Sequence, residues 1–257
     1  MAGRGDTYVV DIETVGVPWD SLDERTREYL QSRTMTESER EAVPHRLGLS
    51  PGTGRVIVIA MQNVTSGPKG GVLVEREGRG RGDAGAAVGS PGAHVPSNGA
   101  WADGTGPMGF HRYDGDERAL LEEFWRMVAK AGRIVSFNGR AFDGPFLMLR
   151  SAMLGVRPSL NLTGYRYSVD SHCDLSEVLS FYGAVRTNYS LDYWCRRFGI
   201  TSPKEEGLDG SKVQPYYEAG RLEEIVSYCV RDVVATAGLY AALKDTLLPL
   251  FDTSRGR

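Results

Sequence analysis

The chain has 257 residues, 41% of them hydrophobic and 25% charged, so it is long enough to bury the core of one large globular domain. Its formal net charge of -3 argues against a protein that coats nucleic acid through bulk positive charge, so such binding would depend on a local basic groove or on metal ions. The three cysteines are far apart in the sequence, which fits a reducing compartment and argues against a structural zinc site.

Two strands are predicted in the first quarter of the chain. Residues 7–12 and 55–64 are short runs of β-branched and other apolar side chains, and a turn-like SPGTG stretch precedes the second run. Residues 19–46, between them, are rich in charge and in good helix formers, so we expect one or two exposed helices there.

A glycine-rich segment follows at about residues 66–108. Within it, the short apolar run 72–75 could pair back onto the preceding strand. The rest cannot bury enough apolar surface to offset its ordering entropy. We therefore expect a single domain over residues 1–257 with a flexible insertion at this place.

Helices alternate with strands in the remainder of the chain. Residues 133–137 form a predicted strand, which follows a helix and could add to the sheet in parallel. The predicted helices are 117–131, 142–154, 174–182, 190–198 and 221–243. This order favours an α/β fold with a mixed sheet, whose first two strands are antiparallel. No apolar run approaches the length that spans a bilayer and no signal peptide is evident, so we expect a cytoplasmic protein.

The first acidic motif is VVDIET, residues 9–14. Side chains at positions i and i+2 of a strand share one face, so Asp11 and Glu13 project together. Two neighbouring carboxylates repel each other unless a cation lies between them, and hard cations such as Mg²⁺ or Mn²⁺ prefer oxygen ligands. Taken alone, the pair is a weak signal and favours a solvated strand end over a metal site.

The second motif, NGRAFDGPFL at residues 138–147, follows the predicted strand 133–137. Asp143 lies at the start of a helix, where it could act as an N-cap or as a metal ligand, directly or through water. Pro145 suits the first turn of such a helix. The motif by itself does not decide between these two roles.

The third motif is YCVRDVVAT, residues 228–236, inside the last predicted helix. Tyr228 and Asp232 are four residues apart and lie one above the other on the helix. Their face flanks an apolar stripe formed by Leu222, Ile225, Val226, Cys229, Val233, Ala237 and Tyr240. An isolated YxxxD pattern would indicate only an exposed pair of polar side chains.

In this order and context, the three motifs resemble a DEDD-type 3′–5′ exonuclease of the ribonuclease H-like superfamily. Tyr228 marks the tyrosine subclass, because the position where the histidine subclass carries its histidine is Ser227. Residues 166–183 and 190–213 also resemble predicted stand-alone exonucleases related to the proofreading domain of family B DNA polymerases. The glycine-rich insertion is where the resemblance is poorest.

The resemblance implies a ribonuclease H-like mixed sheet flanked by helices and hydrolysis of terminal phosphodiester bonds with two divalent cations, Mg²⁺ or Mn²⁺. It assigns catalysis and metal binding to Asp11, Glu13, Asp143 and Asp232, with Tyr228 orienting the attacking water. Candidate substrate-binding residues are Thr14, Asn138 and Phe142. The partner is a nucleic acid with a 3′ end, single-stranded DNA being favoured and RNA remaining open.

Two other readings stay open at the level of sequence: a structure-specific endonuclease and a catalytically silent nucleic-acid-binding module on the same fold. Other polar residues receive structural interpretations. Asp174 and Glu177 form a capping-box pattern, and Arg196 and Arg197 are expected on a solvated helix face.

Overall fold

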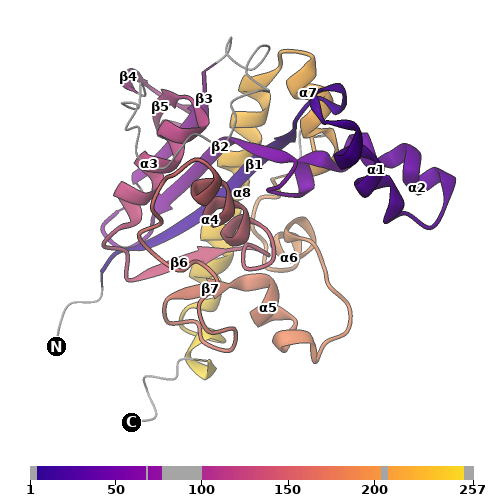
Figure 1. Cartoon of the computed structure of the whole chain (residues 1–257). Coiled ribbons are helices and arrows are strands. Elements are labelled where there is room, and N and C mark those ends of the chain that lie inside the picture. The colour runs from indigo at the N-terminus through magenta and orange to yellow at the C-terminus, as the bar shows by residue number, and fades with distance from the viewer. Residues whose placement is uncertain (1–4, 68, 77–99, 204–207, 252–257) are drawn as a thin grey trace.

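The computed structural model describes residues 5–67, 69–76, 100–203 and 208–251, and these residues form one mixed sheet with helices on both faces (Figure 1). Seven strands lie in the order β4-β5-β3-β2-β1-β6-β7. Their bounds are β1 Thr7–Gly16, β2 Gly54–Asn63, β3 Lys69–Glu75, β4 Ala100–Thr105, β5 His111–Gly115, β6 Arg133–Ser136 and β7 His172–Asp174.

Strand β1 lies between an antiparallel and a parallel neighbour. It pairs antiparallel with β2 from Tyr8 opposite Asn63 to Gly16 opposite Gly54, and parallel with β6 from Thr7 opposite Arg133. This arrangement confirms the predicted mixed sheet and both predicted strand directions. Because β1 is bonded on both edges, its register is fixed from two sides.

The helices cover both faces of the sheet. In Figure 1, α8 (Leu222–Leu243) crosses behind the strands, whereas α4 (Asp143–Met153) and α3 (Glu117–Val128) lie in front. The α8 face also carries α5 (Leu175–Leu179), α6 (Leu191–Arg197) and α7 (Val213–Glu218), whose apolar side chains join the same buried cluster. Helices α1 (Glu24–Ser32) and α2 (Glu37–Ala42) bury no residue and project from the sheet (Figure 1).

The alternation of side chains along β1 decides which face carries the acidic residues. Val9 belongs to the buried cluster under α8, whereas Val10 and Ile12 belong to the cluster under α3 and α4. Because successive side chains of a strand point to opposite faces, Asp11 and Glu13 share the α8 face with Val9.

Several elements differ from the sequence expectations. Strands β5 and β7 and helix α7 were not predicted, since each is only 3 to 6 residues long and too short for a clear period. Strand β3 pairs back onto β2 as expected, and β4 adds a second strand inside the glycine-rich segment, so that segment is not uniformly irregular. Residues 77–99 lie outside the described residues, and the single-domain division stays a prediction.

One expectation about membranes needs correction. Helix α8 is long and apolar enough to cross a bilayer by length and composition, with a hydropathy of 1.2. In this fold it packs along β1 and β2, and 56% of that stretch is buried inside the protein, as in the core helix of a globular domain.

The close approach of Gly16, the last residue of β1, to Gly48 offers a test of the fold. A methyl group at Gly16 would lie 2.6 Å from Leu47 Cβ and 3.0 Å from the Gly48 nitrogen. We expect Gly16→Ala to lower the free energy of unfolding by about 1–3 kcal/mol, as overpacking does. Gly52→Ala is the control, because its methyl group would meet only Ser50 Oγ at 3.7 Å. Urea denaturation of both variants checks this, and equal stabilities would contradict it.

Candidate active site

The first acidic motif lies where the sequence placed it. Asp11 is half-buried and Glu13 is buried, and both point from β1 toward α8. The pairing register of β1 with β2 shifts between Glu13 and Thr14, so a bulge directly follows the second acid. Bulges end regular pairing and redirect side chains, and they are frequent next to active sites.

Asp143 joins this pair from the other side of β1. It occupies the first position of α4, and its Oδ1 accepts a hydrogen bond of 3.1 Å from the backbone amide of Ile12. Because Ile12 stands between Asp11 and Glu13, this bond brings the third carboxylate beside the first two. The N-capping role considered for Asp143 is therefore not the one seen, since the N-cap of α4 is Phe142.

A buried aspartate holds the loop that carries Asp143. The two Asp174 oxygens accept 2.9 Å hydrogen bonds from the amides of Asn138 and Arg140. Asp174 also caps α5, as the sequence indicated, but Glu177 pairs with Arg140 instead of completing the capping box. Asn138 has a φ of 65°, a left-handed conformation that costs energy in a non-glycine residue, so the Asp174 bond helps to maintain a strained turn.

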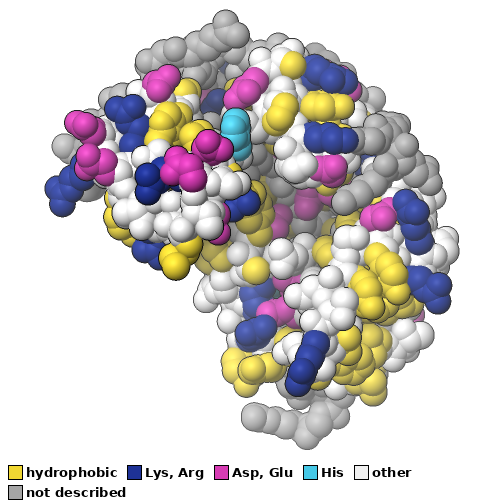
Figure 2. Space-filling view, turned by 90° about the vertical axis from the view of Figure 1, so that its right-hand side faces the viewer, with side chains coloured by type: hydrophobic (Ala, Val, Ile, Leu, Met, Phe, Trp, Pro, Cys, Tyr) yellow, Lys and Arg dark blue, Asp and Glu magenta, His cyan; other side chains and the backbone are white. Residues whose placement is uncertain are grey.

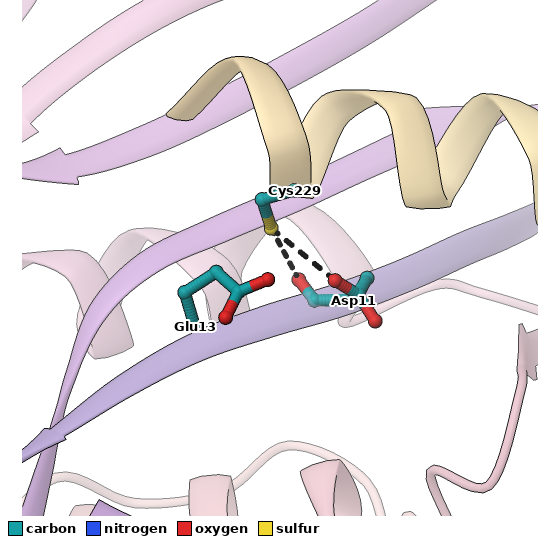
Figure 3. Close-up of side chains that lie close together, drawn as sticks. All are labelled: Asp11, Glu13 and Cys229. Carbon is teal, nitrogen blue, oxygen red and sulfur yellow. Dashed lines mark hydrogen bonds between the residues drawn. The ribbon is translucent and has the colours of Figure 1, made fainter. Parts of the chain in front are cut away.

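Helix α8 carries Tyr228 and Asp232 of the third motif. It also contributes Cys229, which the sequence analysis placed only in the apolar stripe. The Cys229 thiol is 3.4 Å from Asp11 Oδ2 and 3.5 Å from the Asp11 carbonyl oxygen (Figure 3). The ligand atoms of Asp11, Glu13 and Cys229 all lie within 4.8 Å of one another. Cys229 directly follows Tyr228, but a single cysteine on an apolar face carries no sequence signal for this contact.

The carboxylates raise one another's pKa. Burial first, then the charges of Asp143, Asp232 and Glu13, hold the pKa of Asp11 well above its usual range, and the Cys229 hydrogen bond opposes this. Burial and the charges of Asp232 and Asp143 likewise raise the pKa of Glu13. The pKa of Asp143 is raised to about 7, chiefly by burial, although its bond from Ile12 lowers it.

Tyr228 and Asp232 belong to the same electrostatic group. Tyr228 is buried, and burial followed by the charges of Asp232, Glu13 and Asp11 raises the pKa of its hydroxyl far above the usual value. Its hydrogen bond to Asp232 acts in the same direction. Tyr228 is therefore protonated across the physiological range and is a hydrogen-bond donor at this site.

The donor set fits hard divalent cations. Four carboxylates from β1, α4 and α8 crowd together at a cost that the raised pKa values of Asp11, Glu13 and Asp143 record, and a bound cation would reverse that cost. Carboxylate oxygens are the ligands that Mg²⁺ and Mn²⁺ prefer. The buried Cys229 thiol is protonated, since burial and the neighbouring charge of Asp11 raise its pKa well above the usual value.

The three substrate-binding candidates have different surroundings. Asn138 is exposed beside the acidic group. Phe142 is half-buried, with its ring centroid 5.5 Å from that of Phe146, so part of the ring is available for contact. The Thr14 hydroxyl donates to the Gly48 carbonyl oxygen at 2.7 Å, so its proton is used within the protein and only its oxygen is left to accept.

One side of the molecule, on which α5 and α6 lie, is hollowed. Figure 2 shows a hollow between an upper and a lower part of the molecule, with acidic side chains in its floor and a gathering of hydrophobic side chains on its lower rim. The lower part lies at the height of α5 and α6 in Figure 1, whose side of the molecule faces the viewer in Figure 2.

Comparison with known proteins gives consistent matches. A sequence family described as "Predicted 3'-5' exonuclease related to the exonuclease domain of PolB" matches residues 107–247, a span that contains Asp143, Tyr228 and Asp232. The catalytic subunits A of DNA polymerase epsilon from Emericella nidulans and Aspergillus fumigatus are each 27% identical to this chain over 135 residues. That stretch covers 49% of this chain and 6% of each polymerase subunit.

A solved structure matches a larger share of the chain. The family B DNA polymerase from the hyperthermophilic archaeon Pyrobaculum calidifontis superposes with a TM-score of 0.54 over 94% of this chain and 25% of the polymerase, at 18% sequence identity. At this identity the likeness shows the fold alone, and it confirms the predicted ribonuclease H-like architecture.

The raised pKa of Asp143 predicts a pH dependence of stability. Between about pH 4 and pH 7 the folded protein keeps a proton that the unfolded chain releases, so this group stabilises the metal-free fold at low pH and loses that contribution as the pH rises to about 7. Asp143→Asn should therefore gain stability relative to wild type across this window, on the order of a few kcal/mol by pH 8. Urea denaturation with chelator at several pH values measures the difference, and Asp20→Asn serves as an exposed-acid control. Parallel pH curves for wild type and Asp143→Asn would contradict the prediction.

The contact of Cys229 with Asp11 predicts a difference between two substitutions. Cys229→Ser keeps a donor toward the Asp11 carboxylate, whereas Cys229→Ala leaves that buried carboxylate without it. We expect the alanine variant to be less stable than the serine variant by about 1–3 kcal/mol at pH 8. Chemical denaturation of both variants without metal tests this, and equal stabilities would show that the thiol only fills space.

Proposed function

This chain belongs to the family of predicted 3′–5′ exonucleases related to the exonuclease domain of PolB, and we propose that it is itself a metal-dependent 3′–5′ exonuclease. The observation that carries the proposal is the convergence of Asp11, Glu13, Asp143 and Asp232 around β1, with Tyr228 hydrogen-bonded to Asp232. Since the chain spans a small part of its polymerase relatives, its own substrate and reaction are proposals.

The carboxylates would hold two divalent cations, Mg²⁺ or Mn²⁺. Asp11 would contribute to both positions, Glu13 and Asp232 to the one beside Tyr228, and Asp143 to the other. When bound, the cations would supply a lowered pKa for the attacking water and neutralisation of the charge on the attacking and leaving oxygens of the phosphodiester. The protein's own contribution is to fix the carboxylates on a strand and two helices before substrate arrives.

Tyr228 has an orienting role in this proposal. A tyrosine acts as a general base only after its hydroxyl has lost its proton, and burial together with the charges of Asp232, Glu13 and Asp11 holds the pKa of the Tyr228 hydroxyl too high for that. Its hydroxyl would therefore donate a hydrogen bond that positions the attacking water or a phosphate oxygen.

The substrate of the proposal is the 3′ end of a nucleic acid. Asn138 is an exposed amide close to Asp143, and the partly exposed ring of Phe142 could contact the terminal base, because stacking on an aromatic ring is tolerant of sequence. Single-stranded DNA is the favoured substrate, in keeping with the DNA polymerases among the relatives, and RNA is the alternative.

The direct test is degradation of 5′-labelled single-stranded DNA and RNA with Mg²⁺ or Mn²⁺. We expect a ladder that shortens from the 3′ end, with the rate falling by at least about 10³-fold in Asp11→Asn, because that substitution removes a carboxylate from the centre of the group. A circular single strand is the control and should stay intact. Cleavage of the circle would indicate an endonuclease, and metal-dependent binding without cleavage would indicate a silent binding module.

Tyr228→Phe separates orientation from proton transfer. We expect a fall in kcat of about 100-fold or less, at the lower end of the range for general-base catalysis, with the protein still folded. The pH dependence of kcat should keep its shape, because the hydroxyl does not titrate in the working range. A variant with full activity, or a pH profile that loses an inflection, would overturn the orienting role.

A further inference from the structure

Four aromatic side chains gather on and beside helix α6. The rings of Tyr189 and Tyr193 are stacked, with centroids 4.1 Å apart and an interplanar angle of 14°. Both pack edge-on against Trp194, at 5.7 Å and 5.5 Å, and Trp194 lies 6.2 Å from Phe198. We refer to Tyr189, Tyr193, Trp194 and Phe198 as the α6 aromatic surface.

Three of the four rings are exposed although they could pack inward. Tyr189 and Tyr193 are each 38% exposed and Phe198 is 41% exposed. Trp194 is half-buried and packs on the hydrophobic cluster under α8, so it anchors the other rings to the core. Clusters of exposed apolar side chains on a globular protein commonly mark an interaction site.

Helix α6 packs directly on the part of α8 that carries Asp232. The Cys195 thiol on the inner side of α6 is 4.0 Å from the carbonyl oxygen of Ala235, less than one turn beyond Asp232. The charge of Asp232 also acts on this thiol, since it adds to burial in raising the pKa of Cys195 to about 11. The α6 aromatic surface is therefore a short distance from the acidic group.

The charge around the aromatic rings is positive. Arg186 precedes Tyr189 by three residues and Arg197 is the last residue of α6; both are exposed, and neither has a carboxylate partner within the part of the chain that the structure describes. Arg196, next to them, is already paired with Asp192 at 3.0 Å. Unpaired arginines beside exposed aromatic rings suit a ligand with both a phosphate backbone and flat bases.

We propose that the α6 aromatic surface binds the single-stranded nucleic acid that leads into the acidic hollow, by stacking bases on Tyr189 and Tyr193 and pairing phosphates with Arg186 and Arg197. This inference rests on the proposed exonuclease function and adds a binding site outside the catalytic group. The hydrophobic rim and the acidic floor of the hollow lie on the same face of the molecule, so one strand could touch both (Figure 2). Base stacking is tolerant of sequence, as an exonuclease requires.

The first test compares a long strand with a short one. The full chain carrying Asp11→Asn, to stop cleavage, is titrated with 5′-fluorescein-labelled oligodeoxythymidylate of 20 or of 3 nucleotides, followed by fluorescence anisotropy. Adding Tyr189→Ala and Tyr193→Ala should raise the Kd of the 20-mer by about 5- to 100-fold, because each stacked base contributes measurably to affinity. The Kd of the 3-mer, which offers fewer bases for stacking once its 3′ end occupies the acidic hollow, should change by a clearly smaller factor than that of the 20-mer.

Matched variants separate stacking from loss of structure. Tyr193→Phe keeps the ring and should keep the Kd of the 20-mer, whereas Leu149→Ala removes an exposed apolar side chain from α4 on the opposite face and should have no effect. The double alanine variant should also keep the thermal unfolding temperature of its parent. An equal rise in Kd for both oligonucleotides would show a general defect and overturn the inference.

The salt dependence tests the arginines. Arg197→Gln should lower the slope of log Kd against log salt by about 0.7, the value for one phosphate contact to a single strand. Arg196→Gln is the matched control and should change the slope less, because Asp192 already neutralises Arg196. If the slope of log Kd against log salt is unchanged in Arg186→Gln and Arg197→Gln, these arginines do not contact phosphates and that part of the inference is wrong.

The outcomes keep the two proposals apart. If the protein fails to degrade a 3′ end but the tyrosine variants weaken binding of the 20-mer, the surface stands and the exonuclease function falls. If degradation proceeds and the tyrosine variants bind the 20-mer as their parent does, only the surface inference falls. A shift of the variants from dimer to monomer in sedimentation, with unchanged Kd, would instead identify the surface as an interface between two copies.

Discussion

The repulsion among buried carboxylates is the constraint around which this structure is arranged. Asp11, Glu13 and Asp143 all have raised pKa values, first because they are buried and then because each lies in the field of the others or of Asp232. If flexible loops carried these carboxylates, their mutual repulsion would move them apart. Here β1 is hydrogen-bonded on both edges and covered on both faces, so the sheet supplies the rigidity that keeps the carboxylates together.

The parts of the site that follow a regular period could be predicted from sequence. The i, i+2 spacing of Asp11 and Glu13 places both side chains on one face of a strand, and the i, i+4 spacing of Tyr228 and Asp232 places both on one face of a helix. The apolar stripe of α8 fixes which face of that helix packs against the sheet. What joins the motifs could not be predicted in this way. The bond from Ile12 to Asp143 spans 131 residues and the contact of Cys229 with Asp11 spans 218, and no local pattern encodes either.

The same division holds for the fold. The long helices and the two central strands follow from composition and periodicity, whereas β5 and β7 are held mainly by their neighbours in the sheet. Asp174 shows the difference most clearly. Its sequence pattern indicates a helix cap, and Asp174 does cap α5. Its carboxylate also accepts hydrogen bonds from the amides of Asn138 and Arg140, and this second contact depends on the parallel pairing of β6 with β7.

The 218-residue separation between Cys229 and Asp11 has a consequence for how the protein is made. Synthesis delivers β1 long before α8, so the strand with two of the acids must wait until a helix residue 218 positions further along the chain has been made before the group can be completed. Contacts so distant in sequence form late, because the chain must first close the intervening loop. A chain synthesised only as far as β7 therefore lacks the assembled carboxylate group, and the cation binding that we propose for this group would arise only when α8 docks.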